Sequence, residues 1–248
     1  MQSATANRRR PGHACLWLVC LLWLGACAQT RHHRADGIAE QAALGRGAEV
    51  LIVEPDIELS ELLGSGVQQP RADWTESARL LVDDAIAKDL DRRGARLAHY
   101  RPPQDPALAQ QQRQSILLHE AVGTSILIHR HFGVPLPHKG KVFDWTLGPG
   151  VRALDPDARY ALFVFVRDSY ASGGRKAMMA VGLLLGVGVS LGQQIGFASL
   201  VDLDDGRVVW FNLLSSQTGD LRDAEGAKAS VAKLLDGVRA TVTGGVTP

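Results

Sequence analysis

The sequence has few cysteines, few aromatic residues and no excess of either charge. Three cysteines occur in 248 residues, and aromatic side chains make up 6% of the chain. Lys and Arg total 27 against 26 Asp and Glu, which excludes the strongly basic composition typical of nucleic-acid-binding domains. At 46% hydrophobic and 21% charged, the chain is too apolar to be intrinsically disordered. We therefore expect a globular protein with no nucleic-acid partner.

All three cysteines lie in an N-terminal segment that has the pattern of an export signal. Arg8, Arg9 and Arg10 precede an uncharged apolar run over residues 14–26. A transmembrane helix needs about 20 apolar residues, and this run is shorter. A basic start followed by a short apolar core is typical of a secretory signal peptide. The pattern predicts that residues 1–26 are removed on export.

The end of the apolar run, Leu24-Gly25-Ala26-Cys27, resembles the lipobox of bacterial lipoproteins. The resemblance implies cleavage between Ala26 and Cys27, followed by acylation of Cys27 on its sulfur and its new amino group. The alternative is ordinary cleavage after Ala28, because positions 26 and 28 both carry small residues. Two or more acyl chains anchor a protein stably. The absence of Asp after the cysteine is similar to lipoproteins sorted to the outer membrane, so we expect an exported protein anchored there and facing the periplasm.

The mature chain divides into a polar tether over 27–48, a globular domain over 49–240 and a disordered tail over 241–248. Apolar runs predict strands at 50–53, 95–100 and 160–166, and a hairpin of 195–202 with 208–214 around Asp204-Asp205-Gly206. Helical periodicity predicts three main helices, at 73–93, 106–132 and 223–240. Asp73 and Glu76 have the spacing of a capping box at the first of these helices, and Gly94 is its expected C-terminal cap. The fold class that follows is α/β, with a single layered domain and an open mixed sheet of about five strands.

In the order of its elements, the domain distantly resembles exported α/β domains of outer-membrane accessory lipoproteins. These include the curli-secretion lipoprotein and the lipoprotein activators of peptidoglycan synthases. The resemblance covers residues 49–240 and the lipobox, and it implies a non-enzymatic accessory role at the envelope. It transfers a functional role to one residue only, Cys27.

An uncharged, apolar and glycine-rich segment spans residues 177–192. With a period of two, apolar residues share one face and Gly or Ser most of the other. With a helical period, Gly182 with Gly186 and Gly188 with Gly192 form two small-xxx-small pairs. A buried core segment and a segment that contacts a membrane or a second copy of the chain are both open. The candidate contact residues are Arg175, Lys176, Leu183, Leu185 and Val187, together with Trp145 from a Pro- and Gly-rich stretch.

Motifs that would indicate catalysis or a cofactor are weak. His119, His129, His131 and His138 lie close in sequence but lack the spacing of a zinc site on one helix, and Asp168-Ser169 has no assigned base. We therefore expect no catalytic residue, metal or cofactor. The sequence favours a membrane-anchored, non-enzymatic interaction or accessory module that binds an envelope protein or itself. The alternatives are an oligomeric assembly or pore component that uses residues 177–192, and a hydrolase with a dispersed site.

Overall fold

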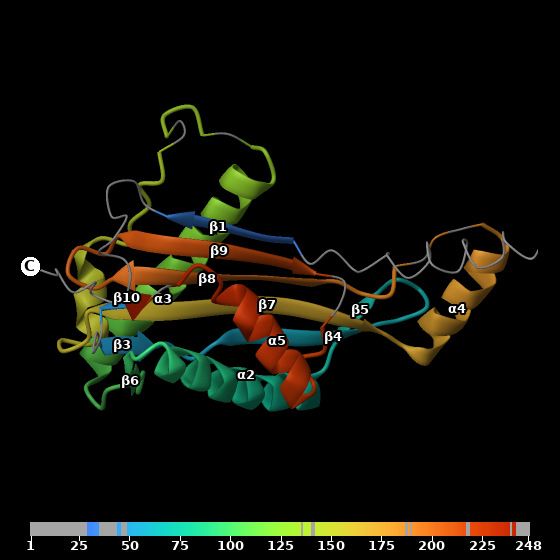
Figure 1. The fold of residues 1–248 in the computed structure, drawn as a ribbon, viewed down its shortest axis with the longest axis horizontal. Coiled ribbons are helices and arrows are strands. Elements are labelled where there is room, and N and C mark those ends of the chain that lie inside the picture. Colours follow the sequence, from blue (N-terminus) through green and yellow to red (C-terminus); the bar gives the residue numbers. More distant parts are fainter. Residues whose placement is uncertain are drawn as a thin grey trace, which may run out of the picture.

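The computed structural model describes residues 29–34, 44–45, 49–134, 136–139, 142–186, 188, 190–216, 219–238 and 240–241. These residues form a single mixed α/β domain around an open mixed sheet, which confirms the predicted fold class (Figure 1). The sheet has eight strands rather than about five. The predicted signal peptide, the lipobox and Cys27 lie outside the described residues.

The main sheet runs in the order β1-β9-β8-β7-β3-β6, and β4 and β5 join it beside β7. Its strands are β1 (Gln29–Arg34), β3 (Glu49–Ile52), β4 (Asp56–Leu62), β5 (Gln68–Pro70), β6 (Arg96–His99), β7 (Tyr160–Ala171), β8 (Gln194–Asp202) and β9 (Val208–Ser216). The helices are α2 (Ala72–Arg92), α3 (Pro106–Ile126), α4 (Gly173–Leu184) and α5 (Ala224–Leu234), with a π-helical turn at Leu127–His131 and a 3-10 helix at Pro149–Leu154. A separate parallel pair joins β2 (Leu44–Gly45) to β10 (Ala240–Thr241).

The long strand β7 is the centre of the sheet. On one side it pairs antiparallel with β8, from Tyr160 opposite Asp202 to Asp168 opposite Gln194. On the other side it pairs in parallel with two strands in succession, first β3 and then β4. Pro55, which cannot donate a ladder hydrogen bond, lies in the break between those two strands. The predicted strand at 160–166 is therefore longer than its apolar run, because β4 extends its pairing to residue 171.

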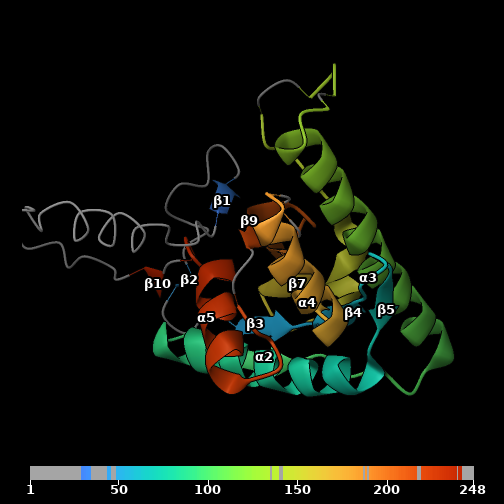
Figure 2. The same cartoon turned by 90° about the vertical axis from the view of Figure 1, so that its right-hand side faces the viewer.

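Helices cover both faces of the sheet, so the core has two parts (Figures 1 and 2). On one face, Val82 of α2 and Val231 of α5 pack against Leu162 and Val164 of β7. On the other face, Phe163 of β7 belongs to a second cluster, to which the end of α3 contributes. The alternation of β7 side chains between these clusters is what the period of two in a strand requires.

Helix α3 crosses its sheet face at unusually close range. A Cβ atom on Gly123 would lie 2.5 Å from Cε2 of Phe197, which is fully buried. Phe197 is itself stacked between Phe165 and Phe211, at centroid distances of 4.8 and 5.2 Å. Gly123 therefore allows the helix backbone to lie against a fixed aromatic ring.

The predicted capping box of the first helix is wrong. The N-cap of α2 is Arg71, without a side-chain cap, and Asp73 lies inside the first turn. The Asp73 carboxylate instead accepts hydrogen bonds from Nε and Nη2 of Arg71, at 3.2 and 2.9 Å. The guanidinium gives this carboxylate two parallel charge-assisted hydrogen bonds, whereas an N-cap would give it a single backbone N–H donor at that oxygen. The other end agrees with the sequence, since Gly94 follows the helix with φ of 77°.

The predicted tether and the predicted set of helices also need correction. Gln29–Arg34, expected to be irregular, form strand β1 antiparallel to β9, because the open edge of β9 offers backbone partners to a polar segment. A fourth helix, α4, forms within the segment whose period the sequence left open. The last helix ends at Leu234 rather than near residue 240, although Val238 still packs in the core. In the predicted tail, Thr241 belongs to β10, and residues 242–248 lie outside the described part of the chain.

Candidate functional site

Helix α4 forms an arm that projects beyond the end of the sheet (Figure 1). We define the α4 arm as residues 173–186. It begins directly after β7, where the Ser172 side chain caps the helix by accepting a hydrogen bond from the Arg175 backbone N–H at 3.2 Å. The backbone N–H of Ser172 donates to the carbonyl of Leu62 at the end of β4, at 3.0 Å. The base of the arm is thus fixed to the sheet.

The far end of the α4 arm carries exposed apolar side chains. Leu183, Leu184 and Leu185 are 64, 87 and 73% exposed, and Val181 and Met178 are 57 and 50% exposed. The buried-core interpretation of the segment is therefore wrong. A helix buries only the side that packs on a neighbour, and this arm extends past the layers that could cover it. Contiguous apolar exposure of this kind marks contact surfaces rather than ordinary solvated helices.

Positive charge is confined to the base of the α4 arm. Lys176 is exposed, and Arg175 is half-buried with its Nε donating to the carbonyl of Ser190 at 2.8 Å. The sequence contains no carboxylate from residue 173 to residue 201. The arm therefore combines a cationic base with an uncharged apolar end.

The other predicted contact residues divide into two groups. Leu183, Leu185, Arg175 and Lys176 come together on the α4 arm, whereas Val187 lies outside the described residues. Trp145 does not join them. It is 8% exposed and belongs to the core cluster on the α3 face, so its interpretation as a partner contact is corrected to a core residue.

A buried polar network, which sequence reasoning missed, lies near the base of the arm. Asp168 Oδ2 accepts hydrogen bonds from the Tyr170 hydroxyl at 2.5 Å and from Gln194 Nε2 at 2.9 Å. The Tyr170 oxygen accepts from the Leu221 backbone N–H at 2.7 Å, and Ser230 donates to Gln194 Oε1 at 3.3 Å. We call Asp168, Tyr170, Gln194 and Ser230 the Asp168 cluster. It joins β7 and β8 to α5 and the loop before it.

Burial dominates the electrostatics of the Asp168 cluster. Burial raises the pKa of Asp168 to about 6, and the two hydrogen bonds that its carboxylate accepts oppose the rise. Burial and the neighbouring carboxylate both raise the pKa of Tyr170. A perturbed carboxyl group is a candidate general base. Here, however, Oδ2 of Asp168 already accepts two hydrogen bonds, and the residue is only 5% exposed. The geometry therefore favours a structural role, in which the carboxylate holds Tyr170 and Gln194 in place.

A polar groove of about 230 Å³ lies on the sheet beside this cluster. It is lined by Glu58, Ser60, Gln68, Arg167, Asp168, Ser169, Gln193 and Ile195. Its one guanidinium, Arg167, is held by both carboxylate oxygens of Asp56 at 3.0 Å each. The groove therefore offers hydroxyl and amide groups but no unpaired arginine for an anion.

A second feature is a buried histidine on the other sheet face. Nε2 of His119 lies 2.5 Å from Oγ of Ser199, and its ring stacks on Phe163 at a centroid distance of 3.9 Å. Burial lowers the pKa of His119 to about 3, so the imidazole is neutral at physiological pH. Ser199 is 1% exposed, which keeps its hydroxyl away from any substrate in solution. This pair is therefore built as a satisfied core contact and not as an accessible nucleophile and base.

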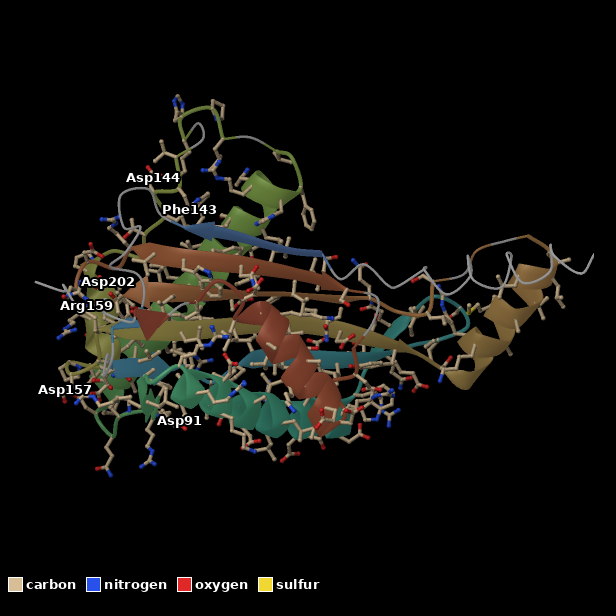
Figure 3. All side chains as sticks on the ribbon, in the orientation of Figure 1. Asp91, Phe143, Asp144, Asp157, Arg159 and Asp202 are labelled. Atoms are coloured by element: carbon tan, nitrogen blue, oxygen red, sulfur yellow. The ribbon has the colours of Figure 1, made fainter. Side chains whose placement is uncertain are left out.

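The remaining histidines do not assemble into a metal centre. Across the described residues, no group of three His, Cys, Asp or Glu side chains converges as metal ligands. His129 instead pairs with the carbonyl of Val134 at 2.6 Å, and His131 stacks near Phe211. At the sheet end remote from α4, Arg159 pairs with Asp202 at 2.6 Å, with both side chains labelled in Figure 3. The turn carboxylates there are thus engaged in surface ion pairs.

Comparison with known proteins gives little. No family model matches the chain, and no curated protein is similar to it. Two solved structures resemble it distantly: the PelC dodecamer from Paraburkholderia phytofirmans and a single-substitution form of the same dodecamer, at 15 and 16% identity and a TM-score of 0.40 each. Each match covers 87% of this chain and 99 or 100% of the neighbour. Matches this distant say nothing about function. Among the described residues, no helix is both long and apolar enough to cross a membrane.

Proposed function

We propose that the protein is a lipid-anchored, non-enzymatic accessory module of the bacterial cell envelope, exported to the outer membrane and facing the periplasm. The lipobox motif ending in Cys27 supports the anchor and the location. The observation that carries the interaction role is the α4 arm, whose Leu183, Leu184 and Leu185 are exposed at the end of the sheet. In this proposal, the arm is the contact surface of the module.

The polar groups of the domain support a non-enzymatic role. The Asp168 carboxylate and the His119 ring, whose pKa values are the most clearly displaced among the acids and histidines, are both buried and hydrogen-bonded to other side chains. A catalytic acid or base needs a substrate within hydrogen-bond reach. Oδ2 of Asp168 already accepts two hydrogen bonds, and Nε2 of His119 pairs with the Ser199 hydroxyl, so these two atoms are engaged within the domain. A hydrolase with a dispersed site has no comparable support.

The second candidate function is an oligomeric envelope assembly formed through the same arm. Its support is the exposed apolar surface, which a second copy could cover. The glycine pair argues against close helix packing, because Gly182 is already buried and Gly186, with φ of 72°, ends the helix. Native mass spectrometry of the detergent-solubilised protein tests this candidate. A strict monomer would eliminate it.

The main proposal is tested by metabolic labelling with a fatty acid, using the wild-type chain and Cys27→Ala in the same cells. We expect label in the wild-type protein only, and wild-type protein in the outer-membrane fraction. The alanine variant is expected to keep the signal peptide or to appear in the soluble fraction. Equal labelling of both chains, or a mature protein that begins after Ala28, would contradict the anchor and the proposed location.

A further inference from the structure

We propose that the α4 arm inserts its apolar end into the same bilayer that holds the lipid anchor, as a second point of attachment. This inference rests on the proposed function for the anchor and names the partner of the arm, a lipid surface. Three observations carry it: the position of the chain start, the distribution of charge along the arm, and the arrangement of the apolar side chains around it.

The start of the described chain and the α4 arm lie at the same end of the sheet. Gln29 of β1 is opposite Ser215 of β9, and the neighbouring Ser216 is opposite Gln194 of β8. Gln194 is in turn opposite Asp168 of β7, three residues before that strand ends and leads into the arm. Figure 1 shows the N-terminal end of β1 on the side of α4.

The anchor site lies only two residues before the start of β1. Cys27 precedes Gln29 by two residues, and two extended residues span at most about 7 Å. The lipid of an acylated Cys27 would therefore enter the membrane near the sheet end from which α4 projects. A bilayer that holds this lipid would therefore lie next to the α4 arm as well.

Charge along the α4 arm matches the layers of a membrane surface. Lys176 and Leu184 are eight residues apart, which corresponds to about 12 Å along a helix axis. Interfacial helices bury their apolar side chains about 5–10 Å into the boundary between headgroups and acyl chains. With Leu184 at that depth, the ammonium of Lys176 lies at the level of the phosphates. No carboxylate between residues 173 and 201 opposes this placement.

The apolar side chains at the end of the arm spread over more than one helix face. Leu183, Leu184 and Leu185 are consecutive, so they point in directions about 100° apart around the helix axis, and all three are largely exposed. A groove on a protein partner, or an arm of a second copy, accepts one helix face with spacings of three and four residues. An end whose apolar side chains cover more than half of the helix circumference is suited to a fluid hydrocarbon phase. Gly186 then reverses the chain direction with φ of 72°.

The test uses the lipidated protein, in which acylation blocks Cys27 and cleavage removes Cys15 and Cys20. A Leu184→Cys variant then carries one free thiol, which is labelled with an environment-sensitive fluorophore. Lys228→Cys on α5 is the matched control, since its side chain is exposed on the body of the domain. Both are reconstituted in vesicles of phosphatidylethanolamine and phosphatidylglycerol containing acyl-chain quenchers. We expect a blue shift and quenching at position 184 and neither at position 228.

A second measurement removes the anchor. The Cys27→Ala protein, produced without residues 1–26, is expected to bind these vesicles weakly, and to lose at least about tenfold in partitioning when Leu183, Leu184 and Leu185 are changed to Gln. A matched triple change of exposed Val67, Leu80 and Leu117 to Gln should leave partitioning unchanged. All six side chains are exposed, so neither triple variant is expected to unfold.

The outcomes separate this inference from the proposed function. Attached lipid, seen by intact mass, together with a fluorophore at position 184 that stays in water overturns the inference and leaves the anchor intact. Missing lipid, together with a quenched fluorophore in a protein that combines Cys27→Ala with Leu184→Cys and lacks residues 1–26, overturns the anchor and supports membrane contact by the arm. A fluorophore shielded from water but not reached by acyl-chain quenchers, with crosslinked dimers, assigns the arm to a second copy and also overturns the inference.

Discussion

Replacing Asp168 by Asn should change how the stability of the protein depends on pH. Burial raises the pKa of the folded-state carboxyl from its ordinary value of 3.8 to about 6. The folded protein therefore holds a proton that the unfolded chain releases between these two pH values. Protonation of Asp168 therefore adds to the free energy of unfolding. This contribution is fully present below pH 3.8 and is lost as the pH rises through about 6.

The size of the effect follows from the displacement of the pKa. One pKa unit corresponds to about 1.4 kcal/mol, so ionising Asp168 at neutral pH costs the folded state about 3 kcal/mol. Asparagine does not ionise and escapes this cost. The unfolding free energy of Asp168→Asn, minus that of the wild type, should increase by about 2 kcal/mol between pH 4 and pH 7, because the unfolded carboxyl is already partly ionised at pH 4. The asparagine amide can also form poorer hydrogen bonds than the carboxyl group, which lowers stability. That loss is the same at each pH, so it does not affect the difference between pH 4 and pH 7.

The assay is urea unfolding at a series of pH values, on proteins that carry Cys27→Ala and are produced without residues 1–26, so that neither lipid nor signal peptide is present. Tyr170→Phe gives a change of opposite sign, because it removes a hydrogen bond that lowers the pKa of Asp168. Its stability relative to the wild type should fall as the pH rises. Two parallel curves for Asp168→Asn and the wild type, with a constant offset from pH 4 to pH 7, would refute the reasoning.

Three other substitutions, one of them with a matched control, test the core. His119 has a pKa lowered by burial to about 3, so the wild type loses stability as the pH falls below 6.5. His119→Gln should remove about 3 kcal/mol of the loss between pH 6.5 and pH 4, and an unchanged acid limb in urea titrations would contradict this. Gly123→Ala places a methyl group against the ring of Phe197 and should destabilise the fold by about 1–3 kcal/mol. The same change at Gly150, where no atom lies within 4 Å of the new methyl, should stay within about 0.5 kcal/mol in thermal melts. Trp145→Ala should cost about 3–5 kcal/mol, whereas a tryptophan that served only a partner would give a variant with wild-type stability.

The parts of the fold that sequence could predict are those specified by neighbouring residues. The hairpin around residues 204–206 depends on a turn in which Gly206 adopts φ of 76°, and apolar strands flank it directly. The strands at 50–53 and 95–100 were likewise predicted from short apolar runs and are present as β3 and β6. Each of these patterns is complete within about ten residues, so no distant contact was needed to interpret it.

The missed elements depend on distant partners. In strand β4, Ile57 and Leu59 alternate with polar residues, which is a strand signal that the sequence does contain. It was missed because the segment follows Pro55 and has no continuous apolar run. Strand β1 is polar and owes its structure to the backbone of β9. The Asp168 cluster draws its members from two strands and a helix, and only the pairing of β7 with β8 brings Asp168 next to Gln194.

For the α4 arm, the sequence singled out the segment but left its conformation open. Both a period of two and a helical period fitted residues 177–192, and the cap formed by Ser172 was the local signal that favoured a helix. The exposure of the α4 side chains could not be predicted, because it depends on how far β7 extends beyond the helices that cover the sheet. Trp145 shows the reverse case, since a tryptophan in a loop-rich stretch can equally fill the core, as it does here.

The pairing of β7 has a mechanical consequence. The strand is bonded to β8 over Tyr160 to Asp168 and to β3 and β4 on its other edge, and the α4 arm begins two residues after its end. A pull on the arm along the strand direction therefore loads many hydrogen bonds together, in shear, instead of opening them one at a time. A force applied to α4 would therefore be carried by the central strands of the sheet. The domain would move with the helix as one rigid unit.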